Sequence, residues 1–285
     1  MSIKATPLGH SRILSVGTYR PKRAVPNSEI VDRIESTDEW IQQRTGIESR
    51  RFAGDDETVI SMAKAACEMA LKRAKLSIED IDTVILSTIS YPFQAPSAAT
   101  ELINELGNPK AAAFDISAAC AGFCYGVAMA SDLVRSGTSR NVLVIGVEKL
   151  SDYTDPDDRA TAFIFADGAG AVIIGQSDQP RIGQTIWGSD ADSRDAITLT
   201  PSFLDYKKNP EKGVGELGWP NITQQGQIVF RWAVYQMSKA GLKALEVAGV
   251  SVDELGAFIP HQANIRIIET MAKEMKIPDS VLIAD

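Results

Sequence analysis

Cysteine and histidine are scarce in this chain of 285 residues, which contains three cysteines and two histidines. An odd and sparse set of cysteines makes a poor disulfide framework and favours a reducing compartment. Neither the number nor the spacing of these residues suggests a metal site. We therefore expect no disulfide, no metal and a cytoplasmic location.

The chain also lacks an excess of positive charge and any long apolar run. Its formal net charge is −8 at pH 7, which argues against a general nucleic-acid binder, because such proteins rely on a basic surface. A local basic patch for phosphates or for an acidic partner stays open. No apolar run has the length needed to span a bilayer, and residues 1–12 lack the apolar core of a signal peptide. We expect a soluble chain without membrane insertion.

What is present is an alternation of strand-like and helix-like segments, which predicts an α/β fold. Near-continuous β-branched runs at residues 83–89 and 141–147 predict strands that are covered on both faces. Residues 61–75 have helical spacing, and residues 223–248 contain a second long helical pattern. Residues 190–220 are polar and contain proline and glycine, so we expect a loop there.

An internal repeat links two distant parts of the chain. Residues 63–82 match residues 237–256 at a constant offset of 174, and each copy reads as a helix, a polar turn and an apolar strand. Two amphipathic units can look alike by chance, or the chain is a duplicated α/β protein with two similar halves. On the second interpretation the C-terminal half is incomplete, because a counterpart of Cys120 would fall at position 294, beyond Asp285.

Cys120 follows the end of a predicted strand at residues 114–117 and precedes a helical pattern at residues 125–135. A helix N-terminus stabilises a thiolate. The small neighbours of Cys120 let a carbonyl approach the backbone, whose N–H can act as an oxyanion donor. A buried small hydrophobe remains the alternative for Cys120 on these grounds, and we expect Cys67 and Cys124 to be such core residues.

His261 follows a strand-like segment at residues 256–260 and precedes a helical pattern that begins near Ile265. Polar residues beyond the carboxyl ends of α/β strands commonly line a ligand crevice. The alternative is a histidine that caps the following helix or fills a turn. The other histidine, His10, is expected to be solvated in the polar N-terminal arm.

Several motifs together resemble one family. Residues 118–123 (Ala-Ala-Cys-Ala-Gly-Phe) resemble the nucleophile motif of β-ketoacyl-acyl-carrier-protein synthase III, and residues 260–264 (Pro-His-Gln-Ala-Asn) resemble its histidine motif. Residues 38–47 resemble the N-terminal signature, and residues 155–171 resemble a further block. The resemblance runs from about Ile13 to the chain end.

This resemblance implies a thiolase-like, duplicated, five-layered α-β-α-β-α fold. Its N-terminal half, residues 1–180, would carry the nucleophilic Cys120. Its C-terminal half, residues 181–285, would carry His261 and be truncated in this chain.

The implied activity is that of an acyltransferase that initiates fatty acid synthesis. Cys120 would take an acyl group from acyl-CoA, malonyl-acyl-carrier-protein would lose CO₂, and the enolate would attack the acyl-Cys120 thioester. His261 would donate to the enolate oxygen together with a family asparagine, which lies beyond Asp285. The resemblance implies no cofactor other than the coenzyme A thioester substrate, and it implies a homodimer.

Further contacts carry over from the family. Trp40 would stack on the adenine of coenzyme A with Arg159 on the other face, while Arg44 and Asn264 would line the pantetheine tunnel. Gly226 would allow close approach of the pantetheine arm.

A second set of positions concerns the carrier protein and the primer. Arg231, Gln262 and Arg266 would contact the acidic carrier protein, although the two arginines are read equally well as surface residues without the resemblance. Ala95 stands where members restricted to acetyl primers have a bulky aromatic side chain, so we expect primers longer than acetyl to be accepted.

Two other functions stay open beside the condensing enzyme. One is a catalytically incomplete chain that still binds coenzyme A or a carrier protein. The other is a polyketide-type starter condensing enzyme of the same fold.

Overall fold

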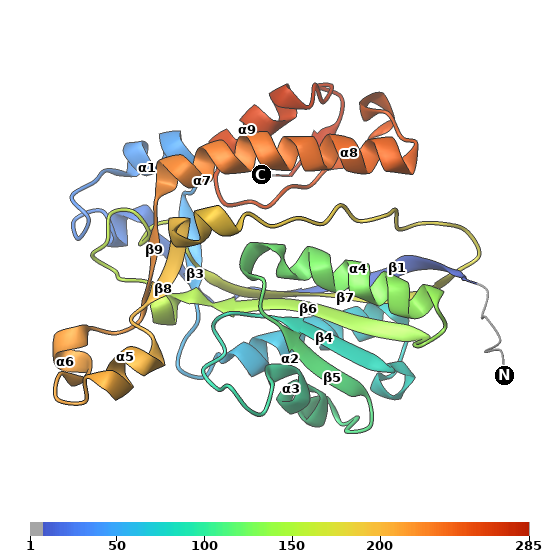
Figure 1. Ribbon diagram of the computed structural model, residues 1–285, viewed down its shortest axis with the longest axis horizontal. Helices are drawn as coiled ribbons and strands as arrows, with labels where there is room; N and C mark the ends of the chain where they lie inside the picture. The colour runs from blue at the N-terminus through green and yellow to red at the C-terminus, as the bar shows by residue number, and fades with distance from the viewer. Residues whose placement is uncertain (1–7, 285) are drawn as a thin grey trace. The chain divides into compact units, whose positions relative to one another are not determined.

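The computed structural model describes residues 8–284, and the chain divides into two compact units (Figure 1). Unit 1 comprises Met1–Arg23, Arg51–Lys149 and Ala166–Thr185. Unit 2 comprises Ala24–Arg50, Leu150–Phe165 and Ile186–Asp285. The division of the chain into evolutionary halves at residue 180 stays a prediction.

Unit 1 is built on a five-stranded mixed sheet in the order β1-β7-β6-β4-β5. The strands are β1 (His10–Tyr19), β4 (Thr83–Ser87), β5 (Ala112–Ile116), β6 (Asn141–Lys149) and β7 (Asp167–Ser177). Strand β4 pairs in parallel with β5 and β6, whereas β7 is antiparallel to both β6 and β1. All five residues of β4 are buried, which confirms a strand covered on both faces.

Helices cover the two faces of this sheet (Figure 1). Helices α2 (Val59–Ala74) and α3 (Ala98–Leu106) share one apolar core with Leu143 and Ile145 of β6. Helix α4 (Gly122–Arg135) shares the other core with Val142 and Val144. Because successive side chains of a strand point to opposite faces, a continuous apolar run supplies both cores.

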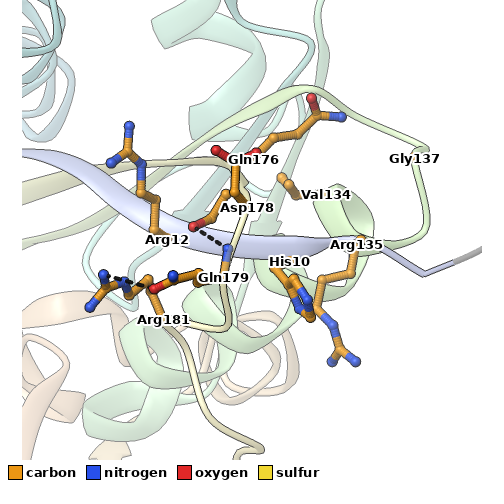
Figure 2. Close-up of a pocket in the computed structure, with 11 residues that line it drawn as sticks. His10, Arg12, Val134, Arg135, Gly137, Gln176, Asp178, Gln179 and Arg181 are labelled. Carbon is orange, nitrogen blue, oxygen red and sulfur yellow. Dashed lines mark hydrogen bonds between the residues drawn. The ribbon is translucent and has the colours of Figure 1, made fainter.

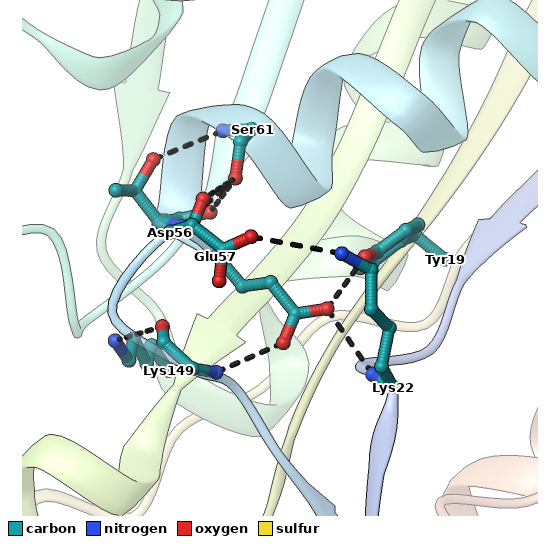
Figure 3. Close-up of polar contacts among 8 residues, drawn as sticks. Tyr19, Lys22, Asp56, Glu57, Ser61 and Lys149 are labelled. Carbon is teal, nitrogen blue, oxygen red and sulfur yellow. Dashed lines mark hydrogen bonds and ion pairs between the residues drawn. The ribbon is translucent and has the colours of Figure 1, made fainter.

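A polar cluster fastens the end of β1 to the start of α2 (Figure 3). The carboxylate of Glu57 accepts hydrogen bonds from the Tyr19 hydroxyl at 2.6 Å, the Gly54 N–H at 2.8 Å and the Lys22 N–H at 3.1 Å. The Lys149 ammonium, at the end of β6, donates to the Gly54 carbonyl at 3.1 Å. The cluster therefore joins three segments that are distant in sequence.

Unit 2 contains many shorter elements. Near its start lie the 3₁₀ turn η1 (Asn27–Glu29) and helix α1 (Asp38–Thr45). The paired strands β2 (Arg23–Pro26) and β3 (Ser49–Phe52) include the two points at which this part of the chain passes from one unit to the other. The later elements are η4 (Leu150–Tyr153), η5 (Ala191–Ala196), β8 (Ile197–Thr200), α5 (Phe203–Lys208), α6 (Gly213–Leu217), β9 (Asn221–Gln224), α7 (Gly226–Trp232), the π-helical η6 (Ala233–Met237), α8 (Ser238–Ala248), η7 (Val252–Glu254), β10 (Ala257–Phe258), α9 (Ile265–Glu274) and β11 (Leu282–Ile283).

The expectation of a loop at residues 190–220 is wrong. The segment forms η5, β8, α5 and α6, and β8 pairs in antiparallel fashion with β9. A capping box starts α5, because the Asp205 carboxylate accepts from the Ser202 N–H at 2.8 Å. Such short elements depend on a cap or on a partner strand. Neither leaves a long periodic pattern of apolar residues in the sequence by which the element could be predicted. The adjoining helical pattern begins at Gly226, because residues 221–224 form a strand.

The internal repeat is confirmed at the level of secondary structure. Helix α2 ends at a left-handed Lys75 (φ 56°), and α8 ends at the equivalent left-handed Gly249 (φ 67°). Each helix is followed by a one-turn 3₁₀ helix with a capping box and then by a strand, β4 or β10. One copy lies in each unit, as a duplicated fold requires.

None of the helices in residues 8–284 combines the length and the apolarity that crossing a bilayer requires.

Candidate active site

Cys120 lies in a tight turn between β5 and α4. Strand β5 ends at Ile116, the 3₁₀ turn η3 (Ala119–Ala121) follows, and α4 begins at Gly122. The residue before the cysteine, Ala119, has φ 43°, a left-handed conformation that residues with a Cβ adopt rarely. Strained backbone of this kind is concentrated at functional sites, so the turn is a credible place for a nucleophile.

The start of α4 is pressed against the sheet below it. A Cβ on Gly122 would lie 1.8 Å from Ser87 Oγ, and a Cβ on Gly126 would lie 2.7 Å from Val144 Cγ1. A side chain at position 122 would therefore require Ser87 to move. The two glycines thus set the height of α4, and with it Cys120, above the carboxyl end of β4.

The surroundings of the Cys120 thiol determine its protonation. Cys120 has exposed surface as a residue, yet protein surrounds its sulfur on most sides, and it is the setting of the sulfur that governs its pKa. Burial raises the pKa of Cys120, the backbone N–H of the same residue lowers it, and the Glu148 carboxylate raises it further. The expected stabilisation of a thiolate by the helix N-terminus is therefore outweighed by burial. No side chain caps the N-terminus of α4.

The other two cysteines divide between core and surface. Cys67 is buried on α2, as predicted, and burial raises the pKa of its thiol. Cys124 is exposed, so the prediction of a core residue is wrong. The core stripe of α4 runs through Gly122, Gly126 and Ala130 at four-residue spacing, and a residue two positions from Gly122 faces away from it.

His261 lies in unit 2, between β10 and α9. The cap of α9 is Asn264, whose Oδ1 accepts from the Arg266 N–H at 2.9 Å, so His261 is not the capping residue. Protein surrounds the imidazole although the residue has exposed surface, and this burial lowers the pKa of His261. A neutral imidazole keeps one N–H donor near pH 7.

Trp40 is the centre of a second cluster in unit 2. It lies in the first turn of α1, where the Trp40 N–H donates to the Thr37 hydroxyl at 3.2 Å. The guanidinium carbons of Arg44 and Arg159 lie 4.6 Å and 5.2 Å from the centre of the Trp40 ring, both within cation–π distance. The Phe163 ring meets Trp40 edge to face at 5.5 Å. An aromatic face beside two cations suits a planar ring attached to phosphates.

The other predicted site residues are at the surface of their own units. Ala95 is exposed in unit 1, at the cis peptide bond Ala95–Pro96. In unit 2, four residues are exposed: Gly226, Arg231, Gln262 and Arg266. Their roles toward pantetheine and the carrier protein stay predictions.

One charged neighbour of Cys120 was not predicted from the sequence. Glu148, at the end of β6, has a largely enclosed carboxylate whose charge acts on Cys120. The only signal in the sequence was a carboxylate at the end of an otherwise apolar strand.

A cavity of about 570 Å³ lies elsewhere in unit 1 (Figure 2). Its walls come from the start of β1, the C-terminal end of α4 and the end of β7, and include His10, Arg12 and Arg181. Cys120 precedes the opposite end of α4, a helix of 14 residues that is about 21 Å long at 1.5 Å per residue. This cavity is therefore not the cysteine site. Residues 8–284 also contain no group of three or more side chains arranged to hold a metal.

Comparison with known proteins relates these features to a family. The family model of 3-oxoacyl-[acyl-carrier-protein] synthase III matches residues 114–191, which include Cys120, and its C-terminal model matches residues 245–285, which include His261. The chain is 51% identical over 280 residues to β-ketoacyl-[acyl-carrier-protein] synthase III 1 of Streptomyces coelicolor, covering 96% of this chain and 82% of that protein. It is also 51% identical to the synthase III of Streptomyces glaucescens, covering 96% and 81% of the two chains.

Solved structures agree with this assignment. The priming β-ketosynthase of the R1128 polyketide pathway matches with a TM-score of 0.95 and 42% identity, over 100% of this chain and 84% of that one. The 3-oxoacyl-[acyl-carrier-protein] synthase III of Aquifex aeolicus matches with a TM-score of 0.80 and 36% identity, over 96% and 84%. The thiolase-like fold is confirmed, and the chain belongs to the β-ketoacyl-[acyl-carrier-protein] synthase III family.

Proposed function

We propose that this chain condenses an acyl-CoA primer with malonyl-acyl-carrier-protein and releases β-ketoacyl-acyl-carrier-protein and CO₂. Membership of the synthase III family supports the reaction class, that of an acyltransferase at the start of fatty acid synthesis. The observation that carries the proposal is the position of Cys120, with an accessible surface, in a strained turn before the uncapped N-terminus of α4.

The first half-reaction transfers the acyl group. The Cys120 thiol loses its proton and attacks the thioester carbonyl, the C–S bond to coenzyme A breaks, and coenzyme A leaves as the thiol. Backbone N–H groups at the turn and at the start of α4 are suited to stabilise the oxyanion of the tetrahedral intermediate. Because burial raises the pKa of Cys120, few molecules carry a standing thiolate at neutral pH. The thiol proton therefore leaves as the sulfur attacks, and an equivalent proton ends on the sulfur of the departing coenzyme A.

The second half-reaction forms the carbon–carbon bond. Malonyl-acyl-carrier-protein loses CO₂, which leaves an enolate. The enolate carbon attacks the carbonyl of acyl-Cys120, the C–S bond breaks, and Cys120 leaves as the thiolate, which then takes a proton from solvent. We propose that the neutral imidazole of His261 donates its N–H to the enolate oxygen. Burial lowers the pKa of His261 and so favours the neutral imidazole, which still carries one N–H that can donate to the enolate oxygen.

The decisive experiment is intact-protein mass spectrometry after mixing the purified chain with acetyl-CoA or dodecanoyl-CoA. We expect one acyl adduct, which is absent from Cys120→Ala and retained in the matched variant Cys124→Ala. An adduct that persists in Cys120→Ala, or no adduct from a folded chain, would contradict the proposal. Reaction of acylated protein with malonyl-acyl-carrier-protein then tests condensation separately.

Coenzyme A recognition is assigned to the Trp40 cluster. The adenine ring is planar and would stack on Trp40, while Arg44 and Arg159 supply charge for the phosphates. Since Arg159 already lies over the Trp40 ring, adenine has to displace it to stack between them. Beyond this thioester substrate, the proposal requires no cofactor.

A second candidate function is the priming of a polyketide. The structural match to a polyketide priming β-ketosynthase, at a TM-score of 0.95, favours it specifically. The two functions share the condensation and differ in the carrier protein and the primer. Product formation with a fatty-acid carrier protein and with a polyketide carrier protein, compared at equal concentrations, distinguishes them.

We further propose a cytoplasmic homodimer. Strand β5 is an edge of the unit 1 sheet and pairs only with β4 among the described strands. An unprotected sheet edge is a ready site for pairing with another chain. Light scattering of the purified protein should give the mass of two chains, and a monomer at micromolar concentration would contradict this proposal.

A further inference from the structure

The carboxylate of Glu148 holds together the segment that follows β4. It accepts from the Ile89 N–H at 2.9 Å, the Ser90 hydroxyl at 2.5 Å and the Thr88 hydroxyl at 3.2 Å. The Ser90 hydroxyl in turn accepts from the Lys149 N–H at 2.8 Å. Enclosing a carboxylate is costly unless it is bonded in this way. The Thr88–Ser90 segment is therefore fixed to the end of β6.

The same segment adjoins both flanks of the turn that carries Cys120. The Thr88 N–H donates to the carbonyl of Ile116, the last residue before the turn, at 3.4 Å. Ser87 Oγ fills the space that a Cβ of Gly122, the first residue after the turn, would occupy. Residues 87–90 thus lie between Glu148 on one side and the Cys120 turn on the other.

We propose that Glu148 is a positioning residue for Cys120. It fixes residues 88–90, which bind Ile116 at one end of the turn that presents the thiol and directly follow Ser87, whose hydroxyl lies against Gly122 at the other end. The inference rests on the proposed function for its purpose, since an acyl-accepting sulfur has to be held at the thioester carbonyl. A nucleophile displaced by about 1 Å can lose a hundredfold in rate.

The charge of Glu148 should change how easily Cys120 loses its proton, an effect that packing alone would not produce. Two other charged residues near the turn in unit 1 are hydrogen-bonded to backbone groups. Asp115 of β5 accepts from the Ala98 and Ala99 N–H groups at 2.7 and 2.8 Å, and Lys149 donates to Gly54. The Glu148 carboxylate disfavours the thiolate of Cys120. A neutral residue of the same shape should therefore make that thiolate easier to form.

The experiment compares Glu148→Gln with Asp82→Asn as the matched control. Asp82 also accepts from two backbone N–H groups, those of Arg140 and Asn141 at 2.6 and 3.0 Å, but at the start of β6 rather than its end. Two quantities are measured: the pH profile of iodoacetamide alkylation at Cys120, and the rate of acylation by acetyl-CoA. Peptide mass spectrometry separates Cys120 from the exposed Cys124.

In Glu148→Gln we expect the alkylation profile to move to lower pH while acylation slows about tenfold, a combination that misfolding does not produce. Asp82→Asn should match the wild-type protein in both the alkylation profile and the acylation rate. Thr88→Val, which keeps the carboxylate and removes one donor, should slow acylation, and its effect should not add to that of Glu148→Gln.

A folded Glu148→Gln with an unchanged profile and an unchanged acylation rate would overturn the inference. Thr88→Val provides the test of acylation if Glu148→Gln does not fold, and a wild-type rate in it would overturn the inference equally. If the unchanged protein accepts no acyl group, the proposed function fails, whereas the alkylation profiles still test Glu148.

Discussion

Trp40 is the residue on which the proposed coenzyme A site depends most. Two guanidinium groups lie within 5.2 Å of its ring centre, so the ring is preorganised beside the charge that phosphates require. We expect Trp40→Ala to raise the KM for acyl-CoA about tenfold and to change kcat little, because stacking on adenine is remote from the reacting carbon. Steady-state kinetics with acetyl-CoA measure both constants.

The exposed Trp187 provides the control for that substitution. Trp187→Ala should leave the KM for acyl-CoA unchanged. An unchanged KM in Trp40→Ala, or an equal rise in both variants, would remove Trp40 from the coenzyme A site.

His261 should titrate below the ordinary histidine pKa of 6.5, since burial disfavours its charged form. The unfolded chain then binds a proton that the folded chain does not, so stability is lost as pH falls from 6.5 toward the folded pKa. NMR titration of the imidazole carbon protons measures this, and His10→Gln assigns the two histidine signals. A pKa at or above 6.5 for His261 would contradict the burial seen here.

Sequence patterns reached some of these residues and not others. Cys120 and His261 stand in contiguous motifs, so the letters alone drew attention to them, and their catalytic roles stay predictions. Glu148 is recognisable only through bonds to residues about 60 positions earlier in the chain, which no local pattern shows. Cys124 is exposed because the neighbouring glycines determine which face of α4 packs on the core, and Cys124 lies on another face.

At the scale of secondary structure, the repeat offers an internal comparison. Lys75 and Gly249 end equivalent helices in the same left-handed conformation, which only glycine adopts without penalty. We expect Lys75→Gly to stabilise the protein by about 1 kcal/mol and Gly249→Ala to destabilise it by about the same amount. Urea unfolding measures both changes.

The control for this pair is Lys72→Gly, in the last turn of the same helix α2. It should destabilise by up to about 1 kcal/mol, because glycine is unfavourable inside a helix. Destabilisation by Lys75→Gly would mean that the lysine side chain matters more than its backbone conformation.

The sequence predicted the strands that are buried along their length. It failed for the short elements that form only through contacts with other segments. Strands β4 and β6 lie in a doubly covered sheet, so their apolar runs were sufficient. Helices α5 and α6 contain no buried residue, and β8 exists through its pairing with β9. The π-helical turn at Ala233–Met237 likewise has no period in the sequence that distinguishes it from an α-helix.

At the scale of the whole molecule, the rate of amide hydrogen exchange should differ between the buried strands and the short exposed helices. We expect the amides of β4 and β6 to exchange most slowly, because both strands are hydrogen-bonded and buried on two faces. Amides of α5 and α6 should exchange fastest among the helices. Hydrogen exchange of the intact protein, resolved by peptide mass spectrometry after quenching and digestion, measures this order, and equal protection of α5 and β4 would contradict it.

The pairing of β1 with β7 bears on how the protein is made. His10 pairs with Ser177, and Tyr19 pairs with Ala169, so β1 meets its partner only after the residues between the two strands have been synthesised. At about 5–20 residues per second, that interval lasts from roughly 8 to 30 seconds. Contacts so distant in sequence also form slowly. Newly made chains therefore carry an unpaired β1 for many seconds, during which a chaperone has time to bind it.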